Sequence, residues 1–293
     1  MSGALWVVAT PIGNLDDLTP RAADALRQAS LVLCEDTRHS ATLLGRVGSA
    51  ARTMSLHAHN ETGRIPAVLA ALAQGHNVAL VSDAGTPCLS DPGARLVAAV
   101  HDAGLPVRTL PGPFAAAAAI AGSGLVPQPF GFWGFLPKKG AARQQALRQR
   151  LTPGPEGEPM THAFYVPGRD LAEVLEDIAA VQGDLAVVVA RELTKLHETW
   201  HRGTAAGLAA GFPEDALRGE AVLLVQIDAP LQGAVALDLD AALLEVANAA
   251  DRKEALRALA RRTGQSRRVL YTRLTQLVGE GATPASRSEP GPS

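Results

Sequence analysis

The chain has 293 residues, a length that favours two domains over one. Hydrophobic residues make up 47% of it, enough for a substantial core, and a net charge of −2 gives no sign that the whole surface binds nucleic acid. Two cysteines exclude a disulfide framework, and no apolar run approaches the ~20 residues of a membrane span. We therefore expect a cytoplasmic enzyme without a signal peptide or membrane segment.

Residues 1–112 alternate between expected strands and helices. The helix expected over 17–29 has Thr19 as its N-cap and Pro20 in its first turn. Short apolar runs predict strands over 4–10, 31–36, 52–59, 78–81 and 106–110. Such alternation predicts an α/β domain with a parallel sheet and helices on both faces.

Residues 113–230 are expected to form a second domain of mixed α+β type, because its connections are longer and more hairpin-like. Apolar runs predict strands over 161–167, 185–192 and 220–228, with a helix between the first two. Residues 127–140 concentrate aromatic side chains in a chain whose aromatic content is only 4%. The Pro- and Gly-rich segment 151–159 is expected to be a flexible loop.

The segment 250–279 predicts a small basic helix-turn-helix unit. Residues 251–278 contain eight Arg or Lys against two acids, which is the electrostatic footprint of a nucleic-acid contact. A solvated helical hairpin that caps the body explains the same charges, and both interpretations stay open. The candidate RNA-binding residues are Arg261, Arg262, Arg267 and Arg268. Residues 280–293 are expected to be a disordered tail.

Four polar loops follow the strands of the first domain, over 9–19, 34–40, 57–61 and 82–87. Because the carboxyl ends of parallel strands meet at one edge of the sheet, their polar groups can converge there, where ligands of open α/β sheets bind. The stretch "NVALVSDAGTPCLSDPG" (77–93) adds Gly and Pro residues that specify a shaped loop, although an ordinary strand-to-helix turn is the alternative. The first loop lacks both GxGxxG and a P-loop Lys, which argues against a dinucleotide site.

Two of these loops carry candidate catalytic groups. In "CEDTR", Glu35 or Asp36 could act as a general base, with Arg38 holding its carboxylate or a phosphate, and a strand-end ion pair is the alternative.

In "HAHNE", His57 and His59 point the same way along a strand and could hold a metal with Glu61, but no further ligand has a defining spacing. Hydrogen bonding and phosphate contact are favoured, and no metal is expected.

Seven ordered motifs of this chain resemble one family. They are "VVATPIGNLDDLTPRA", "CEDTRHSATLL", "HAHNE", "VALVSDAGTPCLSDPG", "LPGP", "GFLP" and "RELTKLHE". The chain resembles the ribosomal RNA small subunit methyltransferase I family over about residues 3–228, and the terminal helix pair also fits. The resemblance implies a two-domain tetrapyrrole-methylase-like fold. It also implies 2′-O-methylation of a cytidine ribose in the decoding centre of 16S rRNA, with S-adenosylmethionine as cofactor and a homodimer as the assembly.

The resemblance also implies which residues bind the cofactor, in a cleft between the two domains. The loop matching 84–89 wraps the cofactor mainly through backbone groups, which explains its Gly and Pro. The implied contacts are Pro11, Ile12, Gly13, Asp83, Ala84, Gly85, Thr86, Leu89, Pro111, Phe114, Ala115, Val166, Leu193 and Thr194.

By the same resemblance, Asp36 matches the general-base Asp of tetrapyrrole methylases and would take the proton of the ribose hydroxyl. Lys195 and Arg191 are expected to hold phosphate or to stabilise a developing oxyanion. The supporting catalytic candidates are Glu35, Arg38, His57, Asn60 and Glu61.

The chain departs from the family in two segments. The family usually reads Tyr-Glu-Ser-Pro-His-Arg where this chain has "FYVPGRD", so the Glu is missing, and Phe114 stands where Ser is common. A small-molecule tetrapyrrole methylase is an alternative, which Asn14 and the basic helix pair oppose. A non-catalytic RNA-binding relative is another. RNA readout is open between the helix pair, the aromatics of 127–140 and a partner chain.

Overall fold

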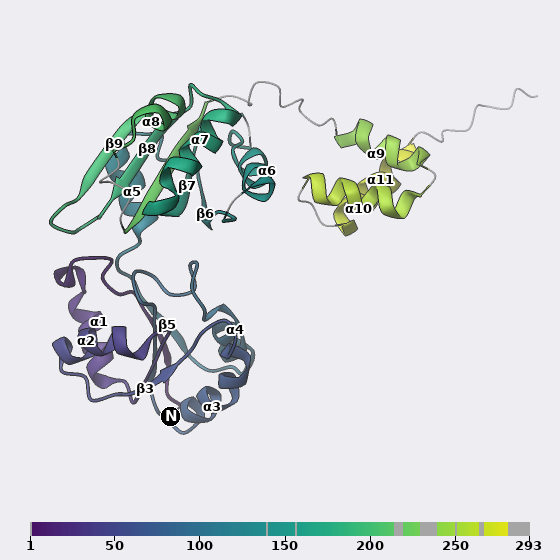
Figure 1. Cartoon of the computed structure of the whole chain (residues 1–293). Helices are drawn as coiled ribbons and strands as arrows, with labels where there is room; N and C mark the ends of the chain where they lie inside the picture. The colour runs from purple at the N-terminus through teal and green to yellow at the C-terminus, as the bar shows by residue number, and fades with distance from the viewer. Residues whose placement is uncertain are drawn as a thin grey trace, which may run out of the picture.

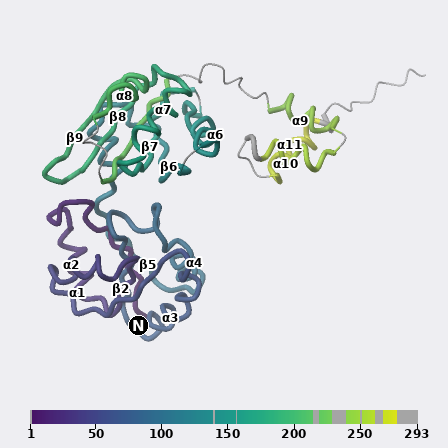
Figure 2. The backbone as a smooth tube through the Cα atoms, in the orientation of Figure 1, coloured from purple at the N-terminus to yellow at the C-terminus, as the bar shows by residue number. Residues whose placement is uncertain are grey.

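The computed structural model describes residues 2–138, 140–155, 157–213, 219–228, 239–249, 251–263 and 267–280. Two lobes, each with a five-stranded sheet, are followed along the chain by a separate group of helices (Figure 1). Figure 2 shows the backbone passing from the first lobe to the second after β5. Among the described residues, no helix is long and apolar enough to cross a membrane. The expected tail lies outside the described residues beyond Glu280.

The first lobe contains the expected parallel sheet, with the strand order β3-β2-β4-β1-β5. All five strands are four residues long. β4 has the predicted bounds, β5 begins one residue later than expected, and β1, β2 and β3 end earlier than the apolar runs suggest, because the following residues turn into the loops. The strands are β1 (Leu5–Val8), β2 (Leu31–Cys34), β3 (Arg52–Ser55), β4 (Val78–Val81) and β5 (Val107–Leu110). β1 lies between β4 and β5, so the loops that leave these three strands are neighbours.

Helices cover both faces of this sheet, because successive strand residues point to opposite sides. Trp6 belongs to the core on one face, under α1 and α2, and Leu5 to the core on the other, under α3 and α4. The Thr19 hydroxyl accepts a hydrogen bond from the backbone N–H of Ala22 at 3.2 Å, which confirms the predicted N-cap. The helices are α1 (Pro20–Gln28), α2 (Thr37–Val47), α3 (Glu61–Ala73) and α4 (Ala94–Asp102), and a 3-10 turn, η1 (Leu15–Asp17), precedes α1.

The second lobe contains the mixed sheet that the sequence predicts, with the order β6-β7-β10-β8-β9. Only the β6–β7 pairing is parallel among the described strands of this sheet. α5 packs on one face and α6, α7 and α8 on the other. The elements are α5 (Ala115–Ser123), β6 (Phe130–Phe135), α6 (Ala141–Arg150), β7 (Met160–Pro167), η2 (Gly168–Asp170), α7 (Leu171–Val181), β8 (Ala186–Arg191), β9 (Thr199–Thr204), α8 (Ala205–Gly211) and β10 (Glu220–Ile227).

Between residues 239 and 280, the described part of the terminal group contains three helices, where the sequence predicts two. α9 (Leu239–Asn248) shares one apolar cluster with α10 (Arg252–Thr263) and α11 (Arg267–Glu280). The predicted unit over 250–279 therefore leaves out a helix that packs in the same core. Its buried side chains are contributed by all three helices, including Leu243, Leu259 and Leu270.

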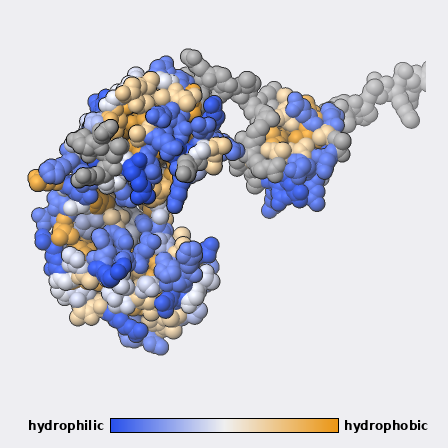
Figure 3. All heavy atoms as spheres, in the orientation of Figure 1, coloured by the Kyte–Doolittle hydropathy of each residue, from blue (hydrophilic) through white to orange (hydrophobic). Residues whose placement is uncertain are grey.

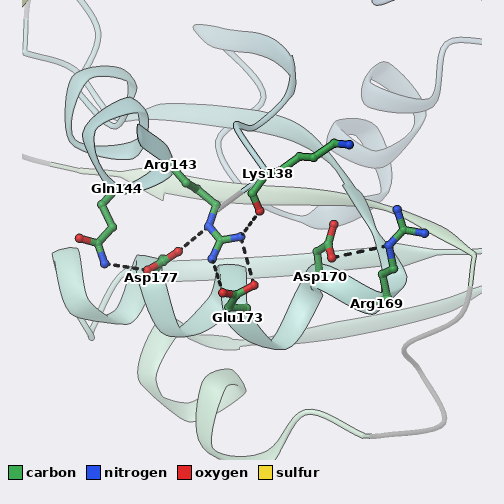
Figure 4. Close-up of polar contacts among 7 residues, drawn as sticks. All are labelled: Lys138, Arg143, Gln144, Arg169, Asp170, Glu173 and Asp177. Atoms are coloured by element: carbon green, nitrogen blue, oxygen red, sulfur yellow. Dashed lines mark hydrogen bonds and ion pairs between the residues drawn. The ribbon is translucent and has the colours of Figure 1, made fainter. Parts of the chain in front are cut away.

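A buried arginine fastens α6 to α7 beside the edge strand β6 (Figure 4). The Arg143 side chain is 2% exposed and forms ion pairs with Asp177 through Nε and with Glu173 through Nη2, the latter at 3.3 Å. Its Nη1 also donates to the backbone carbonyl of Lys138 at 2.9 Å. A single guanidinium therefore satisfies acceptors on α7 and on the segment that follows β6.

Replacing Arg143 with Met is expected to lower the free energy of unfolding by about 3 kcal/mol, because Asp177, with a side chain 13% exposed, is left without its cation. Urea denaturation followed by circular dichroism measures the change. Arg148→Ala, at an exposed position of the same helix, is the control and should shift stability by no more than about 0.5 kcal/mol. Equal stability of both variants would contradict a stabilising role for the buried ion pairs of Arg143.

Candidate active site

The loops after β1 and β4 are joined by a short antiparallel bridge between Thr10 and Gly85. The Thr10 N–H donates to the Gly85 carbonyl at 2.8 Å, and the Gly85 N–H donates back at 3.1 Å. The buried hydroxyl of Ser82 also donates to the Gly85 carbonyl, at 2.9 Å. Gly85 has φ +85°, a backbone conformation that favours glycine, so the tight return of the loop depends on this residue.

The loop after β5 is hydrogen-bonded to the loop after β4, which the bridge joins to the loop after β1. The Thr86 hydroxyl donates to the Pro113 carbonyl at 3.0 Å. A Cβ on Gly85 would lie 3.3 Å from the Ile12 side chain, so the first loop packs directly on the bridge. The three loops that the sequence places at neighbouring strand ends thus form one connected floor, as their convergence at the sheet edge predicts.

The second lobe closes over this floor with the segment after β8. A Cβ on Gly13 would lie only 3.0 Å from the Leu193 carbonyl oxygen and 2.5 Å from Cγ of Lys195. Glu192 and Thr194 adopt left-handed conformations, with φ of +51° and +66°. The Thr194 hydroxyl oxygen is buried without a hydrogen-bond partner. The loop is strained, contains an unpartnered polar atom and packs through Leu193 and Lys195 on a glycine of the other lobe. Such a loop is typical of a ligand site.

A cavity of about 120 Å³ lies between the lobes at this point. The space-filling view shows the surface hollowed where the two lobes meet (Figure 3). The side chains that line the cavity are mostly small and apolar, with a few polar groups from the second lobe. The lining residues are Ile12, Ala84, Ala115, Tyr165, Ala190, Glu192, Leu193, Lys195, Glu220, Ala221 and Val222.

The loop after β2 places Asp36 and Arg38 beside the floor. The Asp36 carboxylate caps α2 through the Arg38 N–H at 2.8 Å and forms an ion pair with the Arg38 guanidinium at 3.0 Å. The hydrogen bond from the Arg38 side chain lowers the pKa of Asp36 to about 2. The Asp36 backbone N–H donates to Asp83 at 3.2 Å, which fixes the two loops to each other. A carboxylate of such low pKa is a weak proton acceptor.

Asp91 has the opposite environment. It belongs to the second Asp-containing turn of the loop after β4, and burial, followed by the charges of Glu35, Asp83 and Glu220, raises the pKa of Asp91 to about 6. Asp91 and Glu220 also contribute to raising the pKa of Tyr165 to about 12, chiefly an effect of that residue's burial. Asp91 is therefore electrostatically coupled to two residues that line the cavity.

Sequence reasoning did not single out Asp91. Its signal was the turn "SDPG", in the same loop as the predicted cofactor contacts.

His57 and Glu61 lie at the end of the edge strand β3, apart from the cavity lining. Glu61 is buried, and its carboxylate accepts a hydrogen bond from the Leu96 N–H at 3.0 Å in the first turn of α4. Asn60 accepts from the His57 N–H at 2.9 Å and fixes the turn before α3. Within the described residues, no group of three or more His, Cys, Asp or Glu is placed to hold a metal ion.

Some of the remaining predicted cofactor contacts lie in the floor loops, and others lie in the second lobe. Pro11, Ile12, Pro111 and Phe114 belong to the floor loops, and Leu89 is 40% exposed. Val166 is buried in the core under α7, because neighbouring strand residues point to opposite faces, and it is Tyr165 that lines the cavity. Arg191 is buried at the end of β8, just before the loop that closes the site.

Some of the basic residues of the terminal helices are exposed, and at least one is paired with an acid of the same unit. Arg267 and Arg268 are exposed on α11, and Arg261 and Arg262 belong to α10. Arg273 forms an ion pair with Asp240 at 2.7 Å, so this acid neutralises part of the positive charge of the three-helix unit.

Comparison with known proteins identifies the family. Residues 4–209 match the model of the tetrapyrrole (corrin/porphyrin) methylases. A protein of Mesorhizobium japonicum named ribosomal RNA small subunit methyltransferase I is 42% identical over 285 residues, which cover 95% of this chain and 94% of that protein. Proteins of the same name from Escherichia coli O157:H7 and Synechocystis sp. are 45% identical over 76% of this chain and 40% identical over 95%. They cover 78% and 100% of those proteins.

Solved structures share the fold. Cobalt precorrin-4 methyltransferase covers 76% of this chain and 94% of its own, with a TM-score of 0.54 and 21% identity. Uroporphyrin-III C-methyltransferase of Thermus thermophilus, solved with S-adenosylhomocysteine, covers 76% and 97%, with a TM-score of 0.53 and 16% identity.

The fold and the cleft define a methyltransferase of the tetrapyrrole-methylase superfamily, and within it the chain belongs to the ribosomal RNA small subunit methyltransferase I family. The methyl donor of this class is S-adenosylmethionine, as expected. The residues fit that donor, because backbone-rich loops, the unpartnered hydroxyl of Thr194 and the acids Glu192 and Glu220 suit a cationic, polar ligand.

Replacing Gly13 with Ala is expected to weaken S-adenosylmethionine binding about tenfold, or ~1.4 kcal/mol, because the added Cβ pushes the Leu193–Lys195 segment outward. Isothermal titration calorimetry measures the affinity. Gly63→Ala is the control, because its Cβ meets nothing within 4 Å in α3. Unchanged affinity in the Gly13 variant would show that this contact plays no part in cofactor binding.

Proposed function

We propose that this protein transfers a methyl group from S-adenosylmethionine to the 2′-hydroxyl of a cytidine ribose in the decoding centre of 16S rRNA. The observation that carries the proposal is the cavity where three floor loops of the first lobe meet the segment after β8, in a chain whose relatives are named as small-subunit rRNA methyltransferases. The seven motifs that the chain shares with the family supply the expected nucleotide and position. The proposed place of action is the cytoplasm, where small ribosomal subunits are found.

The cofactor would be held by the predicted residues of the floor loops and by Leu193 and Thr194. Ile12, Ala84, Ala115 and Leu193 line the cavity with apolar surface. The Thr194 hydroxyl supplies a free polar group. When bound, the cofactor supplies an electrophilic methyl group. The protein then has to orient the ribose hydroxyl toward it and exclude water, so positioning supplies much of the rate.

A group that accepts the proton of the 2′-hydroxyl completes the site. Asp36 is the choice that the resemblance implies, but its ion pair with Arg38 makes it a weak base. Asp91 has a carboxyl pKa close to the working pH and is coupled to Tyr165 at the cavity. We therefore propose Asp91, which does not itself line the cavity, as the proton acceptor, with Asp36 as the alternative. Lys195, held 3.1 Å from Glu192, would stabilise the developing negative charge.

Asp91→Asn is expected to lower the methyl-transfer rate at least about a hundredfold, while Asp36→Asn, which keeps an N-cap side chain, changes it only severalfold. Since the raised pKa keeps Asp91 protonated below about pH 6, the wild-type rate should rise with pH through that value. The single-turnover rate as a function of pH tests both points. A hundredfold loss in Asp36→Asn with full activity in Asp91→Asn would return the role to Asp36.

The proposed reaction is tested with tritiated S-adenosylmethionine and small ribosomal subunits from a strain that lacks this gene. Label on the ribose of one decoding-centre cytidine, mapped by nuclease digestion, is the expected result. Tight cofactor binding without transfer to subunits or free rRNA would contradict the proposal and favour a small-molecule acceptor. Sedimentation of the free protein tests the homodimer that the resemblance implies.

A further inference from the structure

A second cavity, of about 380 Å³, opens beside the first on the second lobe. It lies between the segment that follows β6 and the start of α7, and its size is within the ~300–1,000 Å³ of small-ligand sites. Tyr165 lines both cavities, so the two adjoin at this residue. The lining residues are Phe135, Leu136, Pro137, Lys138, Arg143, Tyr165, Val166, Pro167, Arg169, Asp170, Glu173 and Val174.

This second cavity has positive charge at its rim. Arg143 is buried and its guanidinium is engaged by Asp177, Glu173 and a backbone carbonyl, so its charge is compensated. Lys138 and Arg169 are exposed, and Figure 4 shows both side chains extending away from the Arg143 network. The Arg169 side chain is 81% exposed, and its Nε lies 3.7 Å from Asp170, a loose pair in solvent. Two cations are thus presented to a ligand from outside the protein.

The cavity also offers an aromatic surface. Phe135 is 46% exposed at the end of the edge strand β6, and its ring centroid lies 5.5 Å from that of Tyr165. An exposed aromatic ring next to cations is the arrangement that proteins use for single-stranded RNA, with bases on the ring and phosphates on the cations.

We propose that this cavity receives the base of the RNA nucleotide that is methylated, with its phosphate on Arg169 and Lys138. The inference rests on the proposed function and extends it to a substrate pocket. A nucleotide seated there would have its base against Phe135 and its ribose toward Tyr165, at the boundary with the first cavity. The target must leave its base stack to enter, as it does in enzymes that act on one base of a folded nucleic acid.

One acid of the cavity matches a feature of the expected base. Glu173 is engaged by Arg143, but Asp170 forms only a loose pair with Arg169, and its carboxylate can accept a hydrogen bond from an exocyclic amino group. Cytosine carries such a group and uracil does not, so Asp170 would select against uridine. The segment 165–169, where the family's Glu is missing, contributes Tyr165, Val166, Pro167 and Arg169 to the lining, so the departure from the family motif lies at the proposed pocket.

The test measures the KM for undermethylated small subunits and the affinity for S-adenosylmethionine in the same variants. Arg169→Ala and Lys138→Ala should each raise the KM about tenfold and reduce the slope of log affinity against log salt by about 1, because each removes one phosphate contact. Arg169→Lys should restore most of the loss. Cofactor affinity should not change, since neither residue lines the first cavity.

Arg148→Ala is the matched control, an exposed arginine of α6 that does not line the cavity. A wild-type KM and salt slope in the Arg169 and Lys138 variants, with active wild-type enzyme, would overturn the pocket and leave the proposed function standing. If wild-type protein does not methylate subunits, the proposed function fails. Subunit binding at several salt concentrations then tests the pocket alone, and equal binding by wild type and both variants overturns it.

Discussion

The pair of backbone hydrogen bonds between Thr10 and Gly85 is the constraint on which the site depends. β1 and β4 are parallel neighbours, so the loops that leave them run side by side with backbone groups that the sheet no longer pairs. The bridge pairs them, and the hydroxyls of Thr10 and Ser82 bond to the same buried turn. Because these groups are buried, opening the bridge would leave several unpaired, and the floor is therefore held in one shape before a ligand arrives.

Strain is distributed on both sides of the cleft that this floor forms. Ser90 on the first lobe and Thr194 on the second have positive φ without being glycine, and each such residue costs on the order of 1–3 kcal/mol. Local bonds hold them. The Thr194 N–H donates to Glu198 at 2.7 Å, and a Cβ on Gly134 of β6 would meet the Ser90 hydroxyl at 2.5 Å. Ser90 is thus held by a contact across the cleft, and Thr194 by a hydrogen bond within its own loop.

The sequence predicted the parts of the fold that depend on local chemistry. The buried strands, the Thr19 cap and the convergence of loops follow from residue patterns within short segments. β9, with the polar sequence "TWHRGT", and α6, whose core-facing positions include a buried arginine, carry no such pattern and were missed. The environment of Asp91 could not be predicted, since it depends on charges from distant segments, including Glu35 and Glu220. The sequence suggested a catalytic role for Glu61 for the same reason, since its hydrogen-bond partner, the Leu96 N–H, lies on α4 and far away along the chain.

The charges of the two cavities explain why the site needs both. Glu192 and Glu220 line the first cavity, and Glu220 also helps to raise the pKa of Asp91, so this side of the cleft suits a cationic methyl donor and would repel phosphate. In the proposed complex the RNA backbone would therefore lie at the second cavity, where the exposed Lys138 and Arg169 are placed. The acids of that cavity are themselves next to arginines, Glu173 beside Arg143 and Asp170 beside Arg169, so they oppose phosphate less than free carboxylates would. Two adjoining cavities of different charge would thus let the proposed site take a cationic donor and an anionic acceptor.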